Sequence, residues 1–123
     1  MINLPQNQKR TALSTSTTTQ LAQRLRVYGH PIRLRILDFL ATSHGPQRVT
    51  EITRASEGVG QAIISQQLKI LRENGILVAE RQGASVYYSL TSPKEWELLL
   101  YLREYGTALA ITPDLDQDDE DSD

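Results

Sequence analysis

Residues Gln61 to Lys69 carry side chains of the kinds that read DNA. Glutamine can form paired hydrogen bonds with adenine, serine can bond several base edges, and an aliphatic side chain can contact the methyl group of thymine. Gln66, Ser65 and Ile63 supply one of each, and Lys69 adds a positive charge that suits a phosphate. These residue types favour a surface that enters a major groove. Taken alone, they also fit an ordinary amphipathic helix with a solvated polar face.

The pattern from Gly60 to Leu77 predicts that a helix positions these side chains. Ile64, Leu68 and Leu71 recur at i, i+4 and i+7, so a helix places them in one apolar stripe. At about 100° per residue, the opposite face carries the polar residues. It consists of Ala62, Gln66, Lys69 and Glu73, flanked by Ile63, Ser65 and Ile70. Gly75 stands where a left-handed residue commonly ends a helix.

A shorter helix is predicted directly upstream, over Val49–Ser56. Its apolar residues, Val49, Ile52 and Ala55, recur at a spacing of three. The compact turn Glu57–Gly60 separates it from the longer helix. A short helix, a tight turn and a longer helix with a polar outer face are the parts of a helix-turn-helix.

The segment Ile76–Leu90, ILVAERQGASVYYSL, predicts two strands joined at Gln82–Ala84. Its first half alternates in side-chain type, and its second half is rich in β-branched and aromatic residues. A hairpin after a recognition helix makes a winged helix. The predicted fold class is therefore mainly α with a small β-hairpin, a winged helix-turn-helix of about five helices plus a two-stranded wing.

Three segments of the chain resemble the ArsR/SmtB-type transcriptional repressors of bacteria and archaea. They are GHPIRLRILDFL (29–40), ISQQLKILRENGIL (64–77) and ERQGASVYYSL (80–90), and the resemblance extends over residues 21–109. It implies a dimeric repressor that binds a pseudo-palindromic operator in double-stranded DNA. The candidate DNA-binding residues are Gln61, Ala62, Ile63, Ser65, Gln66, Gln67, Lys69, Arg72 and Arg81. Arg81 is placed at the base of the wing, whose tip is neutral.

The first and last predicted helices are those that the resemblance assigns to a homodimer interface. The first, TQLAQRLRVYG, has a cap among Ser16 to Thr19 and places Leu21, Leu25 and Tyr28 on one face. The last begins with Ser92 as its cap, Pro93 at its first position and Glu95 where a capping box needs it. Its apolar residues are Leu98, Leu102, Tyr105 and Leu109, widened by Trp96, Leu99 and Leu100. Such a helix has more apolar surface than one small core can cover.

The helix that starts at Pro31 is expected to contribute to the core. Its predicted apolar stripe is Ile32, Ile36, Phe39 and Leu40, and Arg33 and Arg35 are expected to point away from it. Together with Arg24 and Arg26 of the preceding helix, they are open to two interpretations. They either contact DNA phosphates or simply keep the surface soluble.

The usual metal sites of the family have no counterpart among these residues. The chain has no cysteine and only two histidines, so the paired thiols found on the first helix of the helix-turn-helix in metal-sensing relatives are missing. The last helix contains no histidine. We expect His30 to be structural or incidental, and we expect no metal or other cofactor. The effector is unknown.

Composition and charge divide the chain into three expected parts. Residues 1–19 are rich in Asn, Gln, Ser and Thr and are predicted to be a disordered arm, and residues 20–111 form the winged-helix domain. Residues 112–123 form an acidic disordered tail. Seven of the fifteen acidic residues lie after residue 113, which leaves residues 1–113 with eight acidic and thirteen basic residues, a formal charge of +5. A basic body suits a nucleic-acid partner.

Two other function classes compete with a DNA-binding regulator. A winged-helix protein-interaction module would need a more aromatic and less basic face. An enzyme is the weakest alternative, because there is no glycine-rich phosphate loop, metal-ligand cluster or nucleophile–base pair. No apolar run approaches the ~20 residues that span a membrane, so we expect a cytoplasmic protein.

Overall fold

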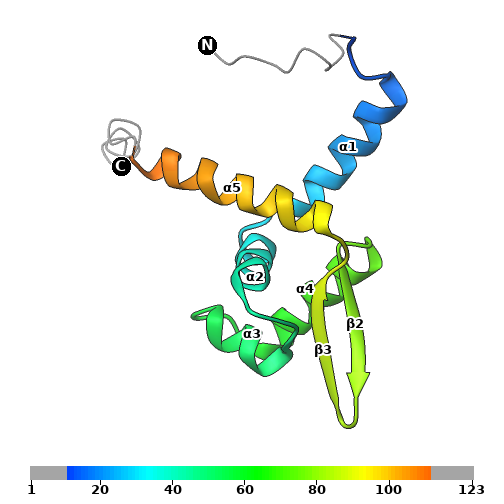
Figure 1. The fold of residues 1–123 in the computed structure, drawn as a ribbon. Coiled ribbons are helices and arrows are strands. Elements are labelled where there is room, and N and C mark those ends of the chain that lie inside the picture. The colour runs from blue at the N-terminus through cyan, green and yellow to red at the C-terminus, as the bar shows by residue number, and fades with distance from the viewer. Residues whose placement is uncertain (1–10, 112–123) are drawn as a thin grey trace.

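The computed structural model describes residues 11–111 of the 123-residue chain. The first ten residues of the predicted arm and the whole predicted tail lie outside this range. The elements, in order, are α1 (Thr15–Tyr28), α2 (Pro31–Thr42), β1 (Gln47–Arg48), α3 (Val49–Ala55), α4 (Gln61–Glu73), β2 (Leu77–Gln82), β3 (Ser85–Leu90) and α5 (Pro93–Ile111). Helices α1 and α5 lie at one end of the molecule, and the β2–β3 hairpin points away from them (Figure 1).

Helix α1 begins earlier than the sequence predicts and extends into the predicted arm. Its cap is Ser14, whose hydroxyl accepts a hydrogen bond from the Thr17 backbone N–H at 3.1 Å, so the prediction of a cap among Ser16 to Thr19 is wrong. Every residue from Ser14 to Thr19 is serine or threonine, and each has a suitable hydroxyl. The run therefore contains no signal that singles out the first helical residue.

The core forms where α2, α3 and α4 meet the base of the hairpin. Its side chains with no exposed surface are Ile36, Leu37, Ile52, Ile64, Leu68, Leu71 and Ile76. Two predictions need correction. In α2, Leu37 is buried while Ile32 and Phe39 are only half-buried, and at the end of α3 the buried residue is Ser56 rather than Ala55. Ser56 is tolerated there because its hydroxyl donates to the Ile52 carbonyl at 2.9 Å.

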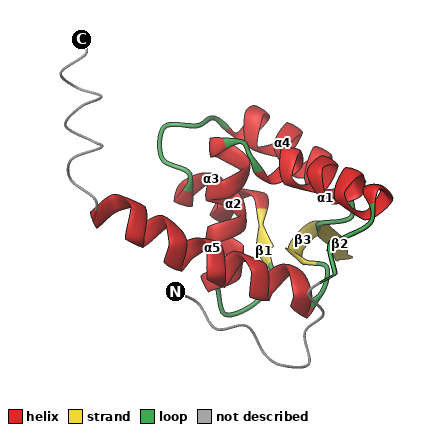
Figure 2. Cartoon of the chain, turned by 90° about the horizontal axis from the view of Figure 1, so that it is seen from above, coloured by secondary structure: helices red, strands yellow, loops and turns green. Residues whose placement is uncertain are grey.

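The wing belongs to a three-stranded sheet of order β1–β3–β2, not to the two-stranded hairpin that was predicted. Strand β1, the short yellow segment beside β3 in Figure 2, pairs Gln47 with Tyr88 and Arg48 with Tyr87. Two residues are too few to show alternation, so this strand leaves no pattern in the sequence. The hairpin turn is as predicted. Gly83 has a positive φ of 64°, which suits a two-residue hairpin turn.

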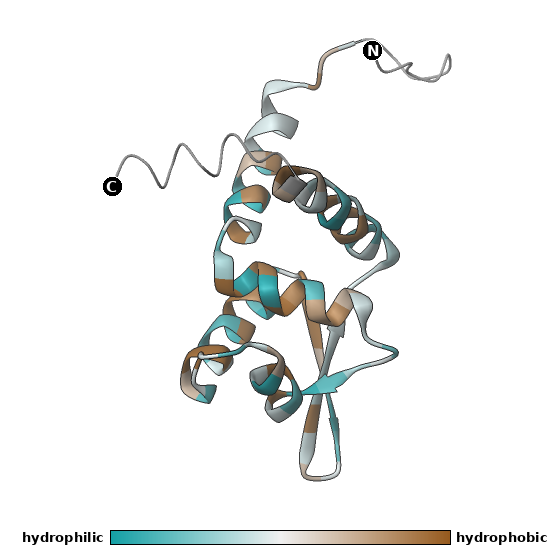
Figure 3. Cartoon of the chain, turned by 90° about the vertical axis from the view of Figure 1, so that its left-hand side faces the viewer, coloured by the Kyte–Doolittle hydropathy of each residue, from teal (hydrophilic) through white to brown (hydrophobic). Residues whose placement is uncertain are grey.

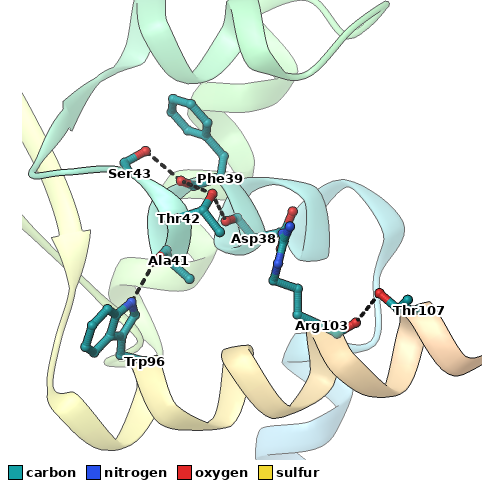
Figure 4. A network of polar contacts seen from close by, with 8 residues as sticks. All are labelled: Asp38, Phe39, Ala41, Thr42, Ser43, Trp96, Arg103 and Thr107. Carbon is teal, nitrogen blue, oxygen red and sulfur yellow. Dashed lines mark hydrogen bonds and ion pairs between the residues drawn. The ribbon is translucent and has the colours of Figure 1, made fainter.

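Helix α5 is joined to α2 by polar contacts as well as by packing (Figure 4). The Trp96 indole N–H donates to the Ala41 carbonyl at 2.6 Å, and Arg103 Nη1 lies 2.7 Å from Asp38 Oδ1. Among residues 93–110 of this helix, only Leu99 is buried, with Leu98 and Leu102 partly buried against the core. No helix in the described residues is both long and apolar enough to cross a membrane.

A hydrogen bond between Tyr28 and Glu95 joins the end of α1 to the start of α5. Glu95 is the residue predicted for a capping box, but its carboxylate accepts from the Tyr28 hydroxyl. Burial first, and then this hydrogen bond, raises the pKa of Tyr28. The hydroxyl is protonated at physiological pH, as it would be at the ordinary tyrosine pKa, and it keeps donating.

Candidate nucleic-acid interface

The apolar stripe of α4 decides which of its side chains face outward. Ile64, Leu68 and Leu71 have no exposed surface, as predicted, so the roll of the helix about its axis is set by the core. The helix ends in a Schellman motif, in which Gly75 N–H donates to the Arg72 carbonyl and Ile76 N–H to the Leu71 carbonyl, each at 3.0 Å. Gly75 has a φ of 74°, which explains why glycine stands there.

The two faces of α4 should respond differently to truncation. Leu68→Ala should lower the free energy of unfolding by about 3–5 kcal/mol, because it removes buried methyl groups and leaves a cavity. The matched control is Ile63→Ala on the same helix, where the side chain is 45% exposed. It should cost less than about 1 kcal/mol. Urea denaturation followed by circular dichroism measures both. Equal losses would contradict the assignment of faces.

Eight of the nine predicted contact residues are exposed in the structure. On α4 they are Gln61, Ala62, Ile63, Ser65, Gln66, Lys69 and Arg72, and on β2 the eighth is Arg81. Amide, hydroxyl, aliphatic and cationic groups therefore make up the exposed surface of α4. A major groove is wide enough to admit this helix, and such groups match base edges, thymine methyls and phosphates.

Gln67 is the exception, because it is less exposed than the other eight. It is half-buried, and its carboxamide oxygen accepts a hydrogen bond from Arg33 Nη1 at 2.9 Å. One position along a helix corresponds to about 100°, so Gln66 points outward while Gln67 turns toward α2. The two adjacent glutamines therefore belong to different surfaces.

The four arginines of α1 and α2 fall into two pairs. Arg33, predicted to point away from the core, is half-buried and donates from Nε to the Val27 carbonyl at 2.7 Å. Arg24 donates from Nη1 to the Asn74 carbonyl at 2.7 Å. Arg26 and Arg35 are exposed and make no side-chain hydrogen bond or ion pair within the described residues. The phosphate interpretation does not suit the first pair, because their guanidinium groups already bind backbone carbonyls.

Arg81 lies near the tip of the wing rather than at its base. It pairs with Val86, next to the terminal pair Gln82–Ser85, and its side chain is exposed. The tip itself, Gly83–Ala84, is neutral. A cation close to the end of the hairpin can reach a phosphate or the minor groove beside the site of α4.

The N-terminus of α3 carries a local charge pair next to the sheet. Glu51 accepts from the backbone N–H of Arg48 at 2.8 Å and from its guanidinium at 3.3 Å. The backbone hydrogen bond, and then the side-chain one, lower the pKa of Glu51. Arg48 is therefore paired locally with Glu51, whereas Lys69 and Arg81 form no ion pair within residues 11–111.

His30 has a structural role at the start of α2. It is the N-cap residue, and its Nδ1 accepts from the Ile32 backbone N–H at 3.2 Å. Among residues 11–111, no group of three or more His, Cys, Asp and Glu side chains is arranged to hold a metal ion. The prediction of a structural His30 is confirmed by this cap.

Known proteins share both the sequence and this geometry. Residues 30–78, from the cap of α2 into β2, match the family described as "Bacterial regulatory protein, arsR family". Over 93 residues the chain is 36% identical to the HTH-type transcriptional regulator NmtR of Mycobacterium tuberculosis. The matched region covers 76% of this chain and 75% of that protein. The chain belongs to the arsR family.

Solved structures of arsR-type proteins have the same fold. The transcriptional repressor BigR from Xylella fastidiosa is 32% identical, with a TM-score of 0.65 over 76% of this chain and 90% of that one. The homodimeric winged helix-turn-helix DNA-binding domain of a Mycobacterium bovis protein is 28% identical, with a TM-score of 0.63 over 77% and 88%. The winged helix-turn-helix is confirmed, and this arsR-family protein is a DNA-binding transcriptional regulator.

Proposed function

We propose that this arsR-family regulator is a homodimeric repressor that reads a pseudo-palindromic operator with α4. The observation that carries the proposal is the division of α4 into two faces. One face is completely buried, and the other presents Gln66, Ser65 and Lys69 to solvent. No aromatic residue lies on α4, which argues against the protein-interaction module considered above.

Exposed apolar side chains on α1 and α5 support the dimer. The exposed set comprises Leu21 and Leu25 on α1 and Trp96, Leu100, Tyr101, Tyr105 and Leu109 on α5. Figure 3 shows brown, hydrophobic stretches on both helices at the end of the molecule away from the wing. A second copy that covers these helices would leave both α4 surfaces free for DNA, and the homodimeric Mycobacterium bovis relative gives a precedent.

Sequence specificity on the one hand and general affinity on the other should depend on different residues of α4. Gln66→Ala and Ser65→Ala should each weaken binding to the operator by about 1–3 kcal/mol and leave binding to random DNA nearly unchanged, because each removes a base contact. Lys69→Ala should weaken binding to both kinds of DNA alike, because a phosphate contact carries no sequence information. Fluorescence anisotropy measures these affinities on an operator enriched from a pool of random duplexes.

The matched control is Glu73→Ala, at the far end of the same face. It tests whether any change on α4 disturbs binding. If Gln66→Ala bound the enriched operator as tightly as the parent protein, the assignment of the reading face would be wrong. If no sequence were enriched from the pool, the proposed function itself would fail.

A further inference from the structure

Two arginines connect α4 to α1, and both bind uncharged groups. Arg24 donates to the Asn74 carbonyl at the end of α4. Arg33 donates through Nε to the Val27 carbonyl in the last turn of α1, and through Nη1 to Gln67 in α4. The three ion pairs found in the described residues involve neither arginine.

The accepting carbonyls are ones that helical hydrogen bonding leaves open. The last four carbonyls of a helix lack an intrahelical partner, and the C-terminal end carries the negative end of the helix dipole. For Val27, the residue four positions on is Pro31, which has no N–H to donate. Asn74 is the C-cap of α4. A guanidinium therefore suits both places, and the planar group of Arg33 can satisfy two acceptors at once.

The two links hold α4 at two separate points. Gln67 and Asn74 are seven residues apart, which is nearly two full turns, so they lie on the same side of the helix and roughly 10 Å apart along its axis. Two points fix an angle as well as a distance. Because Tyr28 is the only fully buried residue of α1, apolar packing alone holds this helix weakly. Arg24 and Arg33 are therefore polar links through which the angle between α1 and α4 can be held.

We propose that Arg24 and Arg33 are positioning residues that set the half-site spacing recognised by the dimer. The proposal rests on the proposed function, in which α1 belongs to the dimer interface and α4 reads DNA. In a symmetric dimer, the separation and tilt of the two recognition helices determine how far apart the half-sites must be. A residue that fixes α4 relative to α1 fixes that geometry without touching a base.

The test measures operator spacing rather than affinity alone. The enriched operator is remade as a set of duplexes whose half-sites are moved together or apart by one and two base pairs. Arg33→Lys keeps the charge, but a single ammonium group cannot reproduce the two directed bonds. We expect it to lose about tenfold in affinity for the native spacing, the scale of one hydrogen bond to a charged group. It should also bind the altered spacings with a smaller penalty than the parent protein does.

Matched variants separate positioning from charge and from folding. Arg35→Ala and Arg26→Ala remove exposed arginines from the same two helices and should keep the parental spacing preference. Gln67→Ala removes only the neutral partner of Arg33 and should broaden the preference as Arg33→Lys does. The Gln67→Ala variant tests the proposal even if an Arg33 variant fails to fold. Arg24→Ala tests the second link independently.

Two results would overturn the proposal. One is an Arg33→Lys or Gln67→Ala variant with the parental spacing preference, and the other is an Arg35→Ala variant that broadens it to the same extent. The affinity losses of Arg33→Ala and Gln67→Ala can also be compared with that of the double variant. If the two losses simply add, the residues do not act through a shared link. If the parent protein enriches no operator, the proposed function fails instead, so the two failures are distinguishable.

Discussion

Placing glutamates at Leu25 and Tyr105 together should convert the protein from a dimer to a monomer and nearly abolish operator binding. The two residues line one apolar groove between α1 and α5, of about 410 Å³, and they are 47% and 65% exposed. Because so much of each side chain is already in contact with water, the fold of the single chain should tolerate the change. An interface that buried these positions would have to bury four unpaired carboxylates, two from each copy.

The expected loss is large because a dimer binds its second half-site as an intramolecular event. Linked binding exceeds the affinity of one module by about 10²–10⁴-fold, so a monomer should lose an operator affinity of that order. Analytical ultracentrifugation gives the oligomeric state, and anisotropy gives the affinity. The control Gln23→Glu adds one charge to the opposite side of α1 and should leave both unchanged. A double variant that remains dimeric would show that the interface lies elsewhere.

Raising the salt concentration from 50 to 200 mM should weaken operator binding by about three orders of magnitude. Lys69, Arg72 and Arg81 are exposed cations around α4 and the wing tip and form no ion pair within residues 11–111. A dimer offers about six such groups. Each phosphate contact releases counterions and contributes about −0.9 to the slope of log affinity against log salt, which gives a slope near −5.

Single substitutions make this prediction specific. Lys69→Ala should reduce the slope by about two, one phosphate contact from each copy. Lys94→Ala removes the same charge from α5, where the lysine is paired with Glu97 at 3.7 Å, and should leave the slope unchanged. An operator affinity that is independent of salt, or equal effects of the two variants, would show that these cations do not meet the phosphate backbone.

The two predictions concern opposite ends of the molecule, and the link between the ends is what the spacing experiment tests. The first region consists of the exposed apolar side chains of α1 and α5, and the second of the exposed polar and cationic side chains of α4 and the wing. A variant at the first end should change the oligomeric state, and a variant at the second should change the salt slope or the base preference. Substitutions at Arg24 and Arg33 should change neither the oligomeric state nor the slope. They should change the preferred spacing and the affinity for the native spacing.

Local patterns in the sequence determined most of the elements and the outer face of α4. The spacing of Ile64, Leu68 and Leu71 matches the period of an α-helix, and the core buries all three. Once those residues face inward, the position of Gln66 follows from 100° per residue. Pro31 and Gly75 are also local signals. Proline has a fixed φ that suits the first turn of a helix, and glycine readily adopts the positive φ that ends one.

Contacts between distant segments were decided only by the tertiary structure. Arg24 and Asn74 are 50 residues apart in the chain, and Arg33 and Gln67 are 34 apart. A pattern of neighbouring residues describes the faces of one helix, but not which helix comes to lie against a given face. For that reason adjacent glutamines of identical chemistry received the same prediction, although one faces solvent and the other binds an arginine. The pairing of β1 with β3 has the same origin, since a strand of two residues exists only because the free edge of β3 lies beside it.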